Sequence, residues 1–173
     1  MRTIFLFILL FFFGFNTFAQ QMSGFGGELS MLGLNANVRV WISKTTGIEG
    51  FTGLNSELES FKPNDPVAGF KFLYTFMYSR NERTYVGLVG KWKWINAFGS
   101  NDKTNLPIPG VMIGKEWFNK RARWNGLAIE LGYQFGSKEY DVYSPINHLL
   151  IGTNKFEEFP LILNLRYTFY KKK

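Results

Sequence analysis

The amino-acid sequence predicts an all-β fold: eight antiparallel strands in up-and-down order, closed into a transmembrane β-barrel. Three observations predict it. Segments of about ten residues alternate between apolar and polar side chains. Short and long connections alternate between these segments. Aromatic residues make up 18% of the chain and gather near the segment ends, as they do in barrels whose ends lie at the two membrane surfaces.

The segment 159–170 shows the clearest alternation. Its odd positions carry only apolar and aromatic side chains, whereas Asn164, Arg166 and Thr168 lie at even positions. Successive side chains of a strand point to opposite faces, so one face is wholly apolar and the other is polar. A strand with lipid outside and polar groups inside needs this division, and we expect the apolar face to contact lipid.

The first three predicted strands follow one another closely, at 24–32, 35–43 and 46–55. In the first, Phe25 and Leu29 lie on the face opposite Glu28. In the second, four apolar residues alternate with polar ones that include Arg39. The third carries three glycines, and its faces stay unassigned. Each strand is close to the ~9–11 residues that a tilted strand needs to cross a bilayer.

The next four predicted strands are 67–78, 84–95, 108–118 and 124–135. The fourth strand of the chain has an aromatic residue at every second position from 70 to 78. The fifth places Trp92 opposite Lys93, and the seventh places Glu130 opposite its leucines. In the sixth, Lys115 falls on the apolar face two residues before Trp117. We expect this lysine to extend its amine to the nearby membrane surface.

The connections predict which rim is which. Three are short, at 43–46, 79–83 and 119–123, and three are long, at 56–66, 96–107 and 136–160. Short turns on the periplasmic rim and long loops on the outer rim are typical of bacterial outer-membrane barrels, and both chain ends then lie on the periplasmic side. The tight connection at Gly33 is the exception. The longest loop carries apolar residues around 140–143 and 148–151, which favours a short helix or hairpin that covers the barrel mouth.

The N-terminus has the pattern of a secretory signal. Arg2 precedes an apolar run at 4–13, and Ala19 offers a small residue at a cleavage point. The run is shorter than the ~20 residues of a membrane-spanning helix. We therefore predict a cleaved signal peptide at 1–19 and a single barrel domain at 20–173. The absence of cysteine excludes disulfides and a lipid-anchored N-terminus.

The polar faces of these strands collect nine charged residues inside the predicted barrel. They are Glu28, Arg39, Glu49, Lys71, Lys91, Lys93, Glu116, Glu130 and Arg166. An eight-stranded barrel has room inside for little more than side chains. We therefore expect an internal network of ion pairs and hydrogen bonds that fills the lumen. A narrow polar path or a buried catalytic group is the alternative.

The aromatic residues predict two girdles at the membrane surfaces. The outer girdle comprises Trp92, Trp94, Tyr133 and Phe135. The periplasmic girdle comprises Tyr78, Trp117, Tyr167 and Phe169. Amphipathic rings prefer the level of the lipid headgroups, so two such belts fit a chain that spans a bilayer.

Two stretches resemble a known group of proteins. The segment GFGGELSMLGLNANVRVWISKTTGIEGFTG at 24–53 is similar to the opening hairpins of small outer-membrane β-barrel proteins of Gram-negative bacteria. The ending LNLRYTF at 163–169 is similar to the terminal strand that such proteins offer to the barrel assembly machinery. The size also resembles the barrels of the OmpA and OmpX type. The resemblance implies an integral protein of the cell outer membrane, with the bilayer and that machinery as partners, and no particular activity.

Other chemistry has little support in the sequence. The net charge is +7, but 171–173 is the only run of basic residues, so we expect no nucleic-acid partner. The single histidine, His148, has Ser144 nearby but no fixed catalytic spacing, and a metal site lacks a second histidine or any cysteine. We predict a non-enzymatic protein without cofactor, whose loop partners the sequence does not identify.

Two alternatives remain open at this stage. A soluble periplasmic lipocalin-like barrel would reverse the faces, with apolar residues inside around a small apolar ligand. A lipid-modifying enzyme of the outer membrane would depend on His148. The asymmetry between short turns and long loops favours the membrane barrel.

Overall fold

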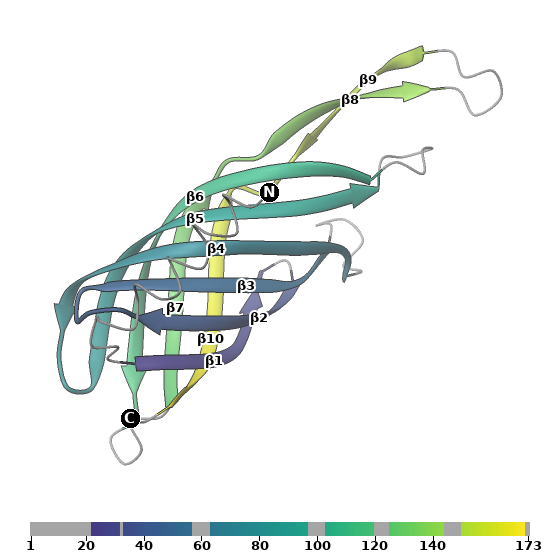
Figure 1. The fold of residues 1–173 in the computed structure, drawn as a ribbon. Coiled ribbons are helices and arrows are strands. Elements are labelled where there is room, and N and C mark those ends of the chain that lie inside the picture. The colour runs from purple at the N-terminus through teal and green to yellow at the C-terminus, as the bar shows by residue number, and fades with distance from the viewer. Residues whose placement is uncertain are drawn as a thin grey trace, which may run out of the picture.

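The computed structural model describes residues 22–31, 33–56, 63–96, 103–119, 125–143 and 150–171. Eight antiparallel strands close into a barrel, and two further strands form a separate hairpin (Figure 1). The predicted fold class is therefore confirmed. Within the described ranges, no helix is long and apolar enough to cross a membrane. The predicted signal peptide at 1–19 lies outside the described residues.

The barrel strands pair with their neighbours in chain order, and the last strand closes the barrel by pairing with the first. They are β1 (Met22–Ser30), β2 (Gly33–Trp41), β3 (Thr46–Ser56), β4 (Pro63–Tyr78), β5 (Glu82–Asn96), β6 (Lys103–Phe118), β7 (Asn125–Gln134) and β10 (Leu161–Lys171). Six of the eight lie within two residues of their predicted bounds at both ends, whereas β4 and β6 begin four and five residues earlier. Alternation thus located the strands better than it located their outer ends.

Tight turns join the strands at one end of the barrel, which we call the turn end. The backbone N–H of Ile42 donates to the carbonyl of Thr46 at 2.9 Å, closing the β2–β3 turn. The Ser79 hydroxyl accepts from the N–H of Glu82 at 3.2 Å, closing the β4–β5 turn. Serine hydroxyls stabilise such turns by satisfying backbone donors. Two of the predicted short connections are therefore tight turns.

The strands extend into two segments that were predicted as loops, 56–66 and 96–107. The prediction began the sixth strand at 108, directly after Pro107, but Pro107 pairs with Trp92 and Pro109 with Gly90. The carbonyl of Pro109 accepts from the N–H of Phe135 at 2.8 Å, so the polar backbone groups of Pro109 point away from β5. In a strand, the polar backbone groups of residues two apart point to the same side, so those of Pro107 also point away from β5. The missing N–H groups therefore leave the β5–β6 ladder intact.

The longest predicted loop, 136–160, is also largely strand. It contains β8 (Ser137–Tyr143) and β9 (Leu150–Glu157), which pair only with each other among the described strands. Figure 1 shows this hairpin projecting beyond the barrel, away from its wall. We call this the hairpin end of the barrel. Ser144 and His148 lie outside the described residues.

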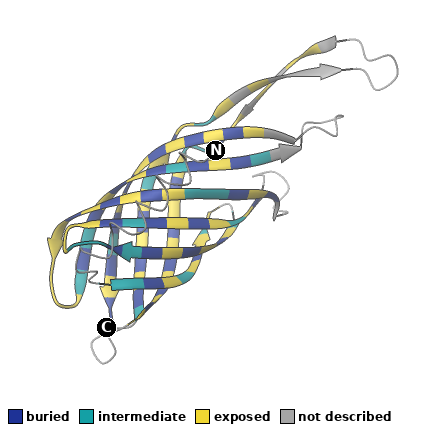
Figure 2. Ribbon diagram, in the orientation of Figure 1, coloured by how far each residue is buried: buried dark blue, intermediate teal, exposed yellow. Residues whose placement is uncertain are grey.

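Burial alternates along the barrel strands, as Figure 2 shows. The exception is the turn end of β4, where Phe76, Met77 and Tyr78 are all exposed beside a shift in register. Outward-facing Phe25 and Leu88 are 66% and 62% exposed, whereas inward-facing Arg39 is fully buried. In β3, whose faces were unassigned, Glu49 points inward and Leu54 outward. Apolar side chains cover the outside, whereas the inside holds the buried charged residues together with a smaller cluster of buried apolar and aromatic ones, such as Trp41, Leu73 and Met112. The lipocalin-like alternative requires the reverse and is wrong.

Candidate functional site

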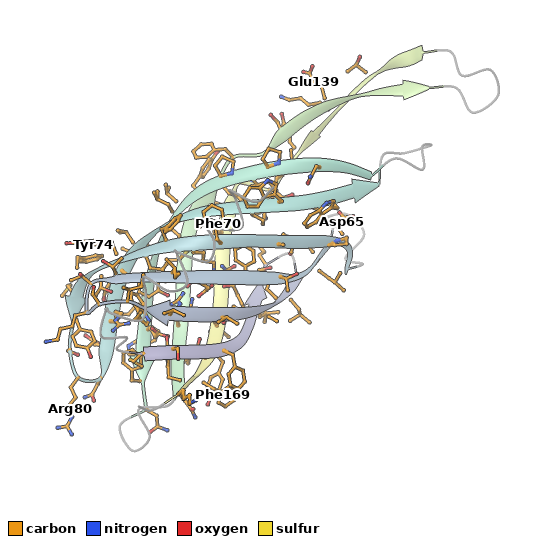
Figure 3. All side chains as sticks on the ribbon, in the orientation of Figure 1. Asp65, Phe70, Tyr74, Arg80, Glu139 and Phe169 are labelled. Carbon is orange, nitrogen blue, oxygen red and sulfur yellow. The ribbon has the colours of Figure 1, made fainter. Side chains whose placement is uncertain are left out.

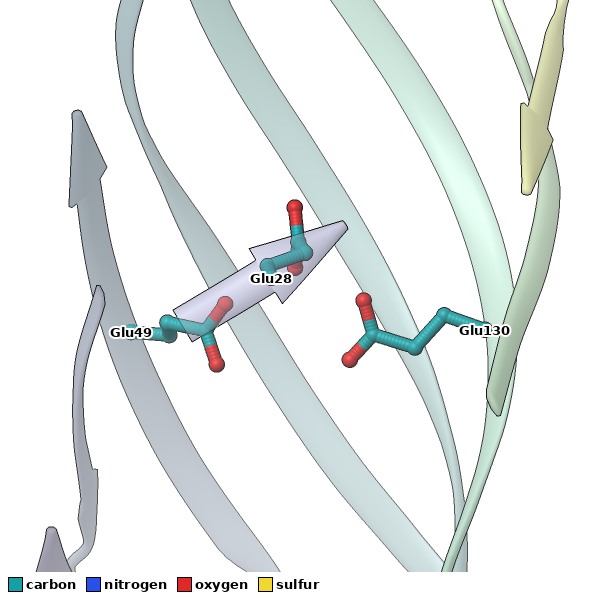
Figure 4. Close-up of side chains that lie close together, drawn as sticks. All are labelled: Glu28, Glu49 and Glu130. Carbon is teal, nitrogen blue, oxygen red and sulfur yellow. The ribbon is translucent and has the colours of Figure 1, made fainter. Parts of the chain in front are cut away.

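Three carboxylates converge in the middle of the barrel. They belong to Glu28 of β1, Glu49 of β3 and Glu130 of β7, and one oxygen of each lies within 4.8 Å of the others. Figure 4 shows them facing one another across the lumen. Lys71 of β4 lies between them: its Nζ is 2.9 Å from Glu49 Oε1 and 2.7 Å from Glu130 Oε2, and it also bonds Glu28. The amine supplies the positive charge that the three acids need.

Two arginines surround the same acids. Arg39 of β2 places Nε 2.5 Å from Glu49 Oε2 and Nη2 2.8 Å from Glu130 Oε1. Arg166 of β10 places Nη1 3.1 Å from Glu49 Oε2 and also pairs with Glu130. All four side chains have no exposed surface. Guanidinium groups suit such buried sites because each offers five donors in a fixed plane.

Tyr85 of β5 connects the acids to the arginines. Its hydroxyl donates to Glu130 Oε1 at 2.7 Å and accepts from Arg39 Nη1 at 3.1 Å and Arg166 Nη2 at 2.9 Å. Gly114 lies directly opposite on β6, and a Cβ there would lie 2.6 Å from the Tyr85 ring. The glycine therefore gives the tyrosine room to cross the lumen.

A layer nearer the turn end is built around Glu116 of β6. Glu116 accepts a 2.5 Å hydrogen bond from the Tyr170 hydroxyl and lies 3.7 Å from Arg39 and 3.5 Å from Arg166. Arg83 is 1% exposed and stacks on Trp41, with its Cζ 3.7 Å from the ring centroid. Stacking on aromatic faces partly compensates a buried guanidinium. Together these two layers form what we call the central network: Glu28, Arg39, Glu49, Lys71, Arg83, Tyr85, Glu116, Glu130, Arg166 and Tyr170.

A second group of charges lies at the hairpin end, and we call it the outer cluster: Asp65, Lys91, Lys93 and Glu158. Lys91 Nζ is 2.9 Å from Glu158 Oε1, and Lys93 Nζ is 3.3 Å from Glu158 Oε2. Lys93 Nζ is also 3.3 Å from Asp65 Oδ2. All four residues are at most 8% exposed. Glu158 follows the hairpin strand β9 directly, so the projecting hairpin and the lumen are linked by one side chain.

The buried charges are balanced. Among the described residues, six acids and six bases are buried: Glu28, Glu49, Asp65, Glu116, Glu130 and Glu158 with Arg39, Lys71, Arg83, Lys91, Lys93 and Arg166. Unpaired buried charges cost several kcal/mol each, so equal numbers of acids and bases favour the burial of so many in one lumen. Arg83 is the exception among the described residues, because its nitrogens have no hydrogen-bond partner and its guanidinium stacks on Trp41 instead. A cavity of about 40 Å³ lies beside Lys91, lined in part by the amides of Asn35 and Asn55. That volume suits a few waters.

The three central glutamates have the geometry of a possible metal site, but their partners indicate another role. Lys71 contacts all three carboxylates, and Arg39 and Arg166 bond two of them. These cations already neutralise the oxygens that a metal would use. The arrangement is therefore an ion-pair network.

The structure places all nine predicted lumen residues inside the barrel. Seven join the central network, whereas Lys91 and Lys93 join the outer cluster. The prediction did not include Asp65, Arg83 or Glu158, because these lie in segments that were read as loops or at a strand end. Tyr85 shares the parity of Lys91 and Lys93, and that alternation could have identified it.

The aromatic residues predicted as girdles lie on the outside of the barrel. Seven are 37–57% exposed and Trp94 is half-buried: Tyr78, Trp92, Trp94, Trp117, Tyr133, Phe135, Tyr167 and Phe169. Figure 3 shows Phe70, Tyr74 and Phe169 projecting from the outer face. Lys115 also lies there, with its Nζ 3.0 Å from Glu82 Oε2 and 5.6 Å from the Trp117 ring centroid. Its charge is therefore paired with Glu82 beside the Trp117 ring.

Comparison with known proteins identifies the fold. No family model and no curated protein matches the sequence. The N-terminal β-barrel domain of OprF from Pseudomonas aeruginosa superposes with a TM-score of 0.54 at 10% identity, covering 88% of this chain and 98% of that one. This likeness confirms the fold, an eight-stranded barrel of the outer-membrane type, and says nothing of activity.

Two further solved structures are similar in outline. Ail, the attachment invasion locus protein of Yersinia pestis, has a TM-score of 0.36 at 11% identity, covering 87% of this chain and 95% of its own. OmpT, an outer-membrane protein of Vibrio cholerae, has a TM-score of 0.33 at 14% identity, covering 87% of this chain and 52% of its own. Both superpose too loosely to carry an argument.

Proposed function

We propose that the chain is an integral protein of the bacterial outer membrane that crosses the bilayer as a closed β-barrel. The distribution of side chains carries this proposal. Large apolar residues cover the outside, with Leu34 and Phe25 67% and 66% exposed, while the charged residues are buried inside. In water such a surface would drive aggregation, whereas in a bilayer it is the surface that lipid solvates.

Export and assembly follow from the same proposal. Residues 1–19 act as the cleaved signal that delivers the chain to the periplasm. The last strand, β10, is presented to the barrel assembly machinery, in keeping with the resemblance of residues 163–169 to terminal strands of this kind. β10 closes the barrel by pairing with β1, so its docking is the step that completes the fold.

The lumen is proposed to be a plug and not a pore or a catalytic centre. The central network spans β1, β2, β3, β4, β5, β6, β7 and β10, and every barrel strand contributes at least one of its side chains. Buried ion pairs, and the hydrogen bonds of Tyr85 from β5, link these side chains across the lumen. The barrel is then a membrane anchor with a filled interior.

The function of the anchor is proposed to be the presentation of the β8–β9 hairpin at the cell surface. Figure 1 shows this hairpin projecting beyond the barrel, and Glu139, labelled in Figure 3, lies on it. Its strands pair only with each other in the described structure, which leaves both outer edges without a sheet neighbour. A projecting two-stranded ribbon suits contact with another envelope component or surface partner.

A gel experiment tests the membrane proposal. Membranes of expressing cells are separated from the soluble fraction and run in detergent, unboiled and boiled. We expect the chain in the membrane fraction, with a mobility that shifts on boiling because the closed barrel resists detergent until heated. A soluble chain whose mobility does not change on boiling would contradict the proposal.

A further inference from the structure

Glu158 differs from the other buried acids because of where it is attached. Its backbone N–H donates to the carbonyl of Gly136 at 2.8 Å, which closes the base of the β8–β9 hairpin. Its side chain then turns into the barrel and is 6% exposed. The carboxylates of the central network come from barrel strands, whereas this one comes from the segment that carries the hairpin.

The groups that receive Glu158 are fixed to the barrel wall. Lys91 and Lys93 lie two residues apart on β5, so both amines point to the same side of the strand. Each binds a different oxygen of the Glu158 carboxylate, at 2.9 Å and 3.3 Å. Asp65 of β4 offsets one of the two positive charges. Without Glu158, each of the two buried amines would lose one carboxylate oxygen.

No strand ladder ties the hairpin to the barrel wall in the described structure, and β8 and β9 form a sheet of their own. Immediately after Glu158 the chain is fixed again, because the carbonyls of Phe159 and Pro160 accept from the Gln134 side chain and backbone, both at 2.7 Å. Displacement of the hairpin would thus withdraw Glu158 while β7 and β10 stay in place.

A small cavity lies beside the site and has a mixed lining. It measures about 40 Å³ and contacts Lys91, Asn35, Asn55 and Gln134 as well as apolar residues such as Ile162. The side-chain oxygens of Asn35 and Asn55 are buried and have no hydrogen-bond partner in the described structure. Buried polar atoms of this kind are normally satisfied by water. An incoming anion could therefore keep part of its hydration.

We propose that Lys91, Lys93 and Asp65 form an anion-binding site at the hairpin end, with Glu158 as its built-in occupant. Displacement of the hairpin exposes the two lysines to an external anionic group, a phosphate or a carboxylate. Glu158 acts as a latch that couples the surface hairpin to the outer part of the lumen. The inference rests on the proposed function only in assigning the hairpin to the cell surface.

Lysine accessibility tests the latch in the full chain, folded in detergent micelles. An amine-reactive reagent is applied, and labelled lysines are identified by mass spectrometry. In Glu158→Gln we expect Lys91 and Lys93 to react about tenfold faster or more than in the unaltered chain, because charge-assisted hydrogen bonds are lost from a buried site. Lys71, inside the central network, stays protected in both.

The neighbouring residue supplies the matched control. Glu157 is 66% exposed in its side chain and pairs with Lys155 at 2.5 Å on the hairpin surface. Glu157→Gln removes the same charge one position earlier and should leave Lys91 and Lys93 protected. Equal protection in Glu158→Gln and the unaltered chain, or equal labelling in both variants, would overturn the latch.

The anion site has its own readout. Labelling of Glu158→Gln is repeated in inorganic phosphate and in chloride at equal ionic strength. We expect phosphate to slow the labelling of Lys91 and Lys93, and equal rates in the two salts would overturn the anion-site assignment.

A second variant serves if Glu158→Gln does not fold. Glu158→Asp keeps the negative charge on a shorter side chain, and we expect at least one of the two lysines to become labelled. Because the readout needs no bilayer, its failure is separate from a failure of the gel experiment.

Discussion

Tyr85 lies directly opposite Gly114 in the β5–β6 pair, and its ring fills the space that a side chain at 114 would take. The hydroxyl of the same tyrosine bonds Glu130, Arg39 and Arg166. A residue without a side chain on one strand thus permits the hydrogen bonds that link acids and bases across the lumen. The central network depends on glycine as well as on charge.

Gly114→Val should therefore destabilise the barrel by about 1–3 kcal/mol, the usual cost of overpacking a filled interior. A Cβ at this position would lie 2.6 Å from the Tyr85 ring, which must move and give up its hydrogen bonds. The measurement is urea unfolding in lipid vesicles, followed by tryptophan fluorescence. Gly50→Ala is the control, because a Cβ there meets nothing within 4 Å. Equal stability of the two variants would contradict this account.

Glu130→Gln should cost about 3–5 kcal/mol of unfolding free energy, the range for removing one partner of a buried ion pair. Lys71, Arg39 and Arg166 would then share one fewer negative charge while staying buried. Glu82→Gln breaks the Lys115 pair, whose side chains are 42–43% exposed, and should cost ~0–1 kcal/mol. The same unfolding assay compares them. A smaller loss for Glu130→Gln than for Glu82→Gln would show that the network is not stabilising.

Leu88→Arg should destabilise the barrel in vesicles by about 2–4 kcal/mol, the cost of a basic residue at the middle of a lipid-facing surface. Leu88 lies near the centre of β5 and is 62% exposed. In water, an arginine at an exposed position would cost little. Lys115→Leu is the comparison and should change stability by about 1 kcal/mol or less, since Lys115 lies beside Trp117 near the turn end. Tolerance of Leu88→Arg would indicate that this face does not contact lipid.

The unaltered chain should carry no steady current in planar bilayers, because the central network and the outer cluster close the lumen in series. Glu158→Gln should remain silent as well, since it opens the outer cluster alone and leaves Lys71 bonded to all three central acids. Recording both proteins at several voltages checks this. Stable, discrete conductance steps from the unaltered barrel would refute the filled lumen.

Much of this architecture could be read from the sequence, because a period of two assigns each side chain to a face. Glu28 and Arg166 follow directly from that alternation. The same rule does not say which residues meet across the lumen. Lys71 and Glu130 lie on β4 and β7, which are not neighbours, and their contact depends on the stagger of the closed barrel.

The outer cluster could not be predicted for a different reason. Asp65 lies next to Pro66, and Glu158 is followed closely by Pro160, so both positions carry the composition of loops. In the structure Pro66 pairs with Leu54, which extends β4 and points Asp65 inward. Glu158 lies outside any strand and has no alternating neighbours to assign it a face. Its burial depends on tertiary hydrogen bonds to Gly136 and the two lysines.

Tryptophan quenching tests the central claim most directly, namely that the apolar face contacts lipid and the charged face does not. Two single-tryptophan variants keep either Trp117, which is 38% exposed on the outside, or Trp41, which is fully buried inside. Both are folded into vesicles that contain lipids brominated on their acyl chains. We predict strong quenching of Trp117 and little quenching of Trp41. Strong quenching of Trp41 together with an unquenched Trp117 would mean that the charged face contacts lipid, and it would contradict the account.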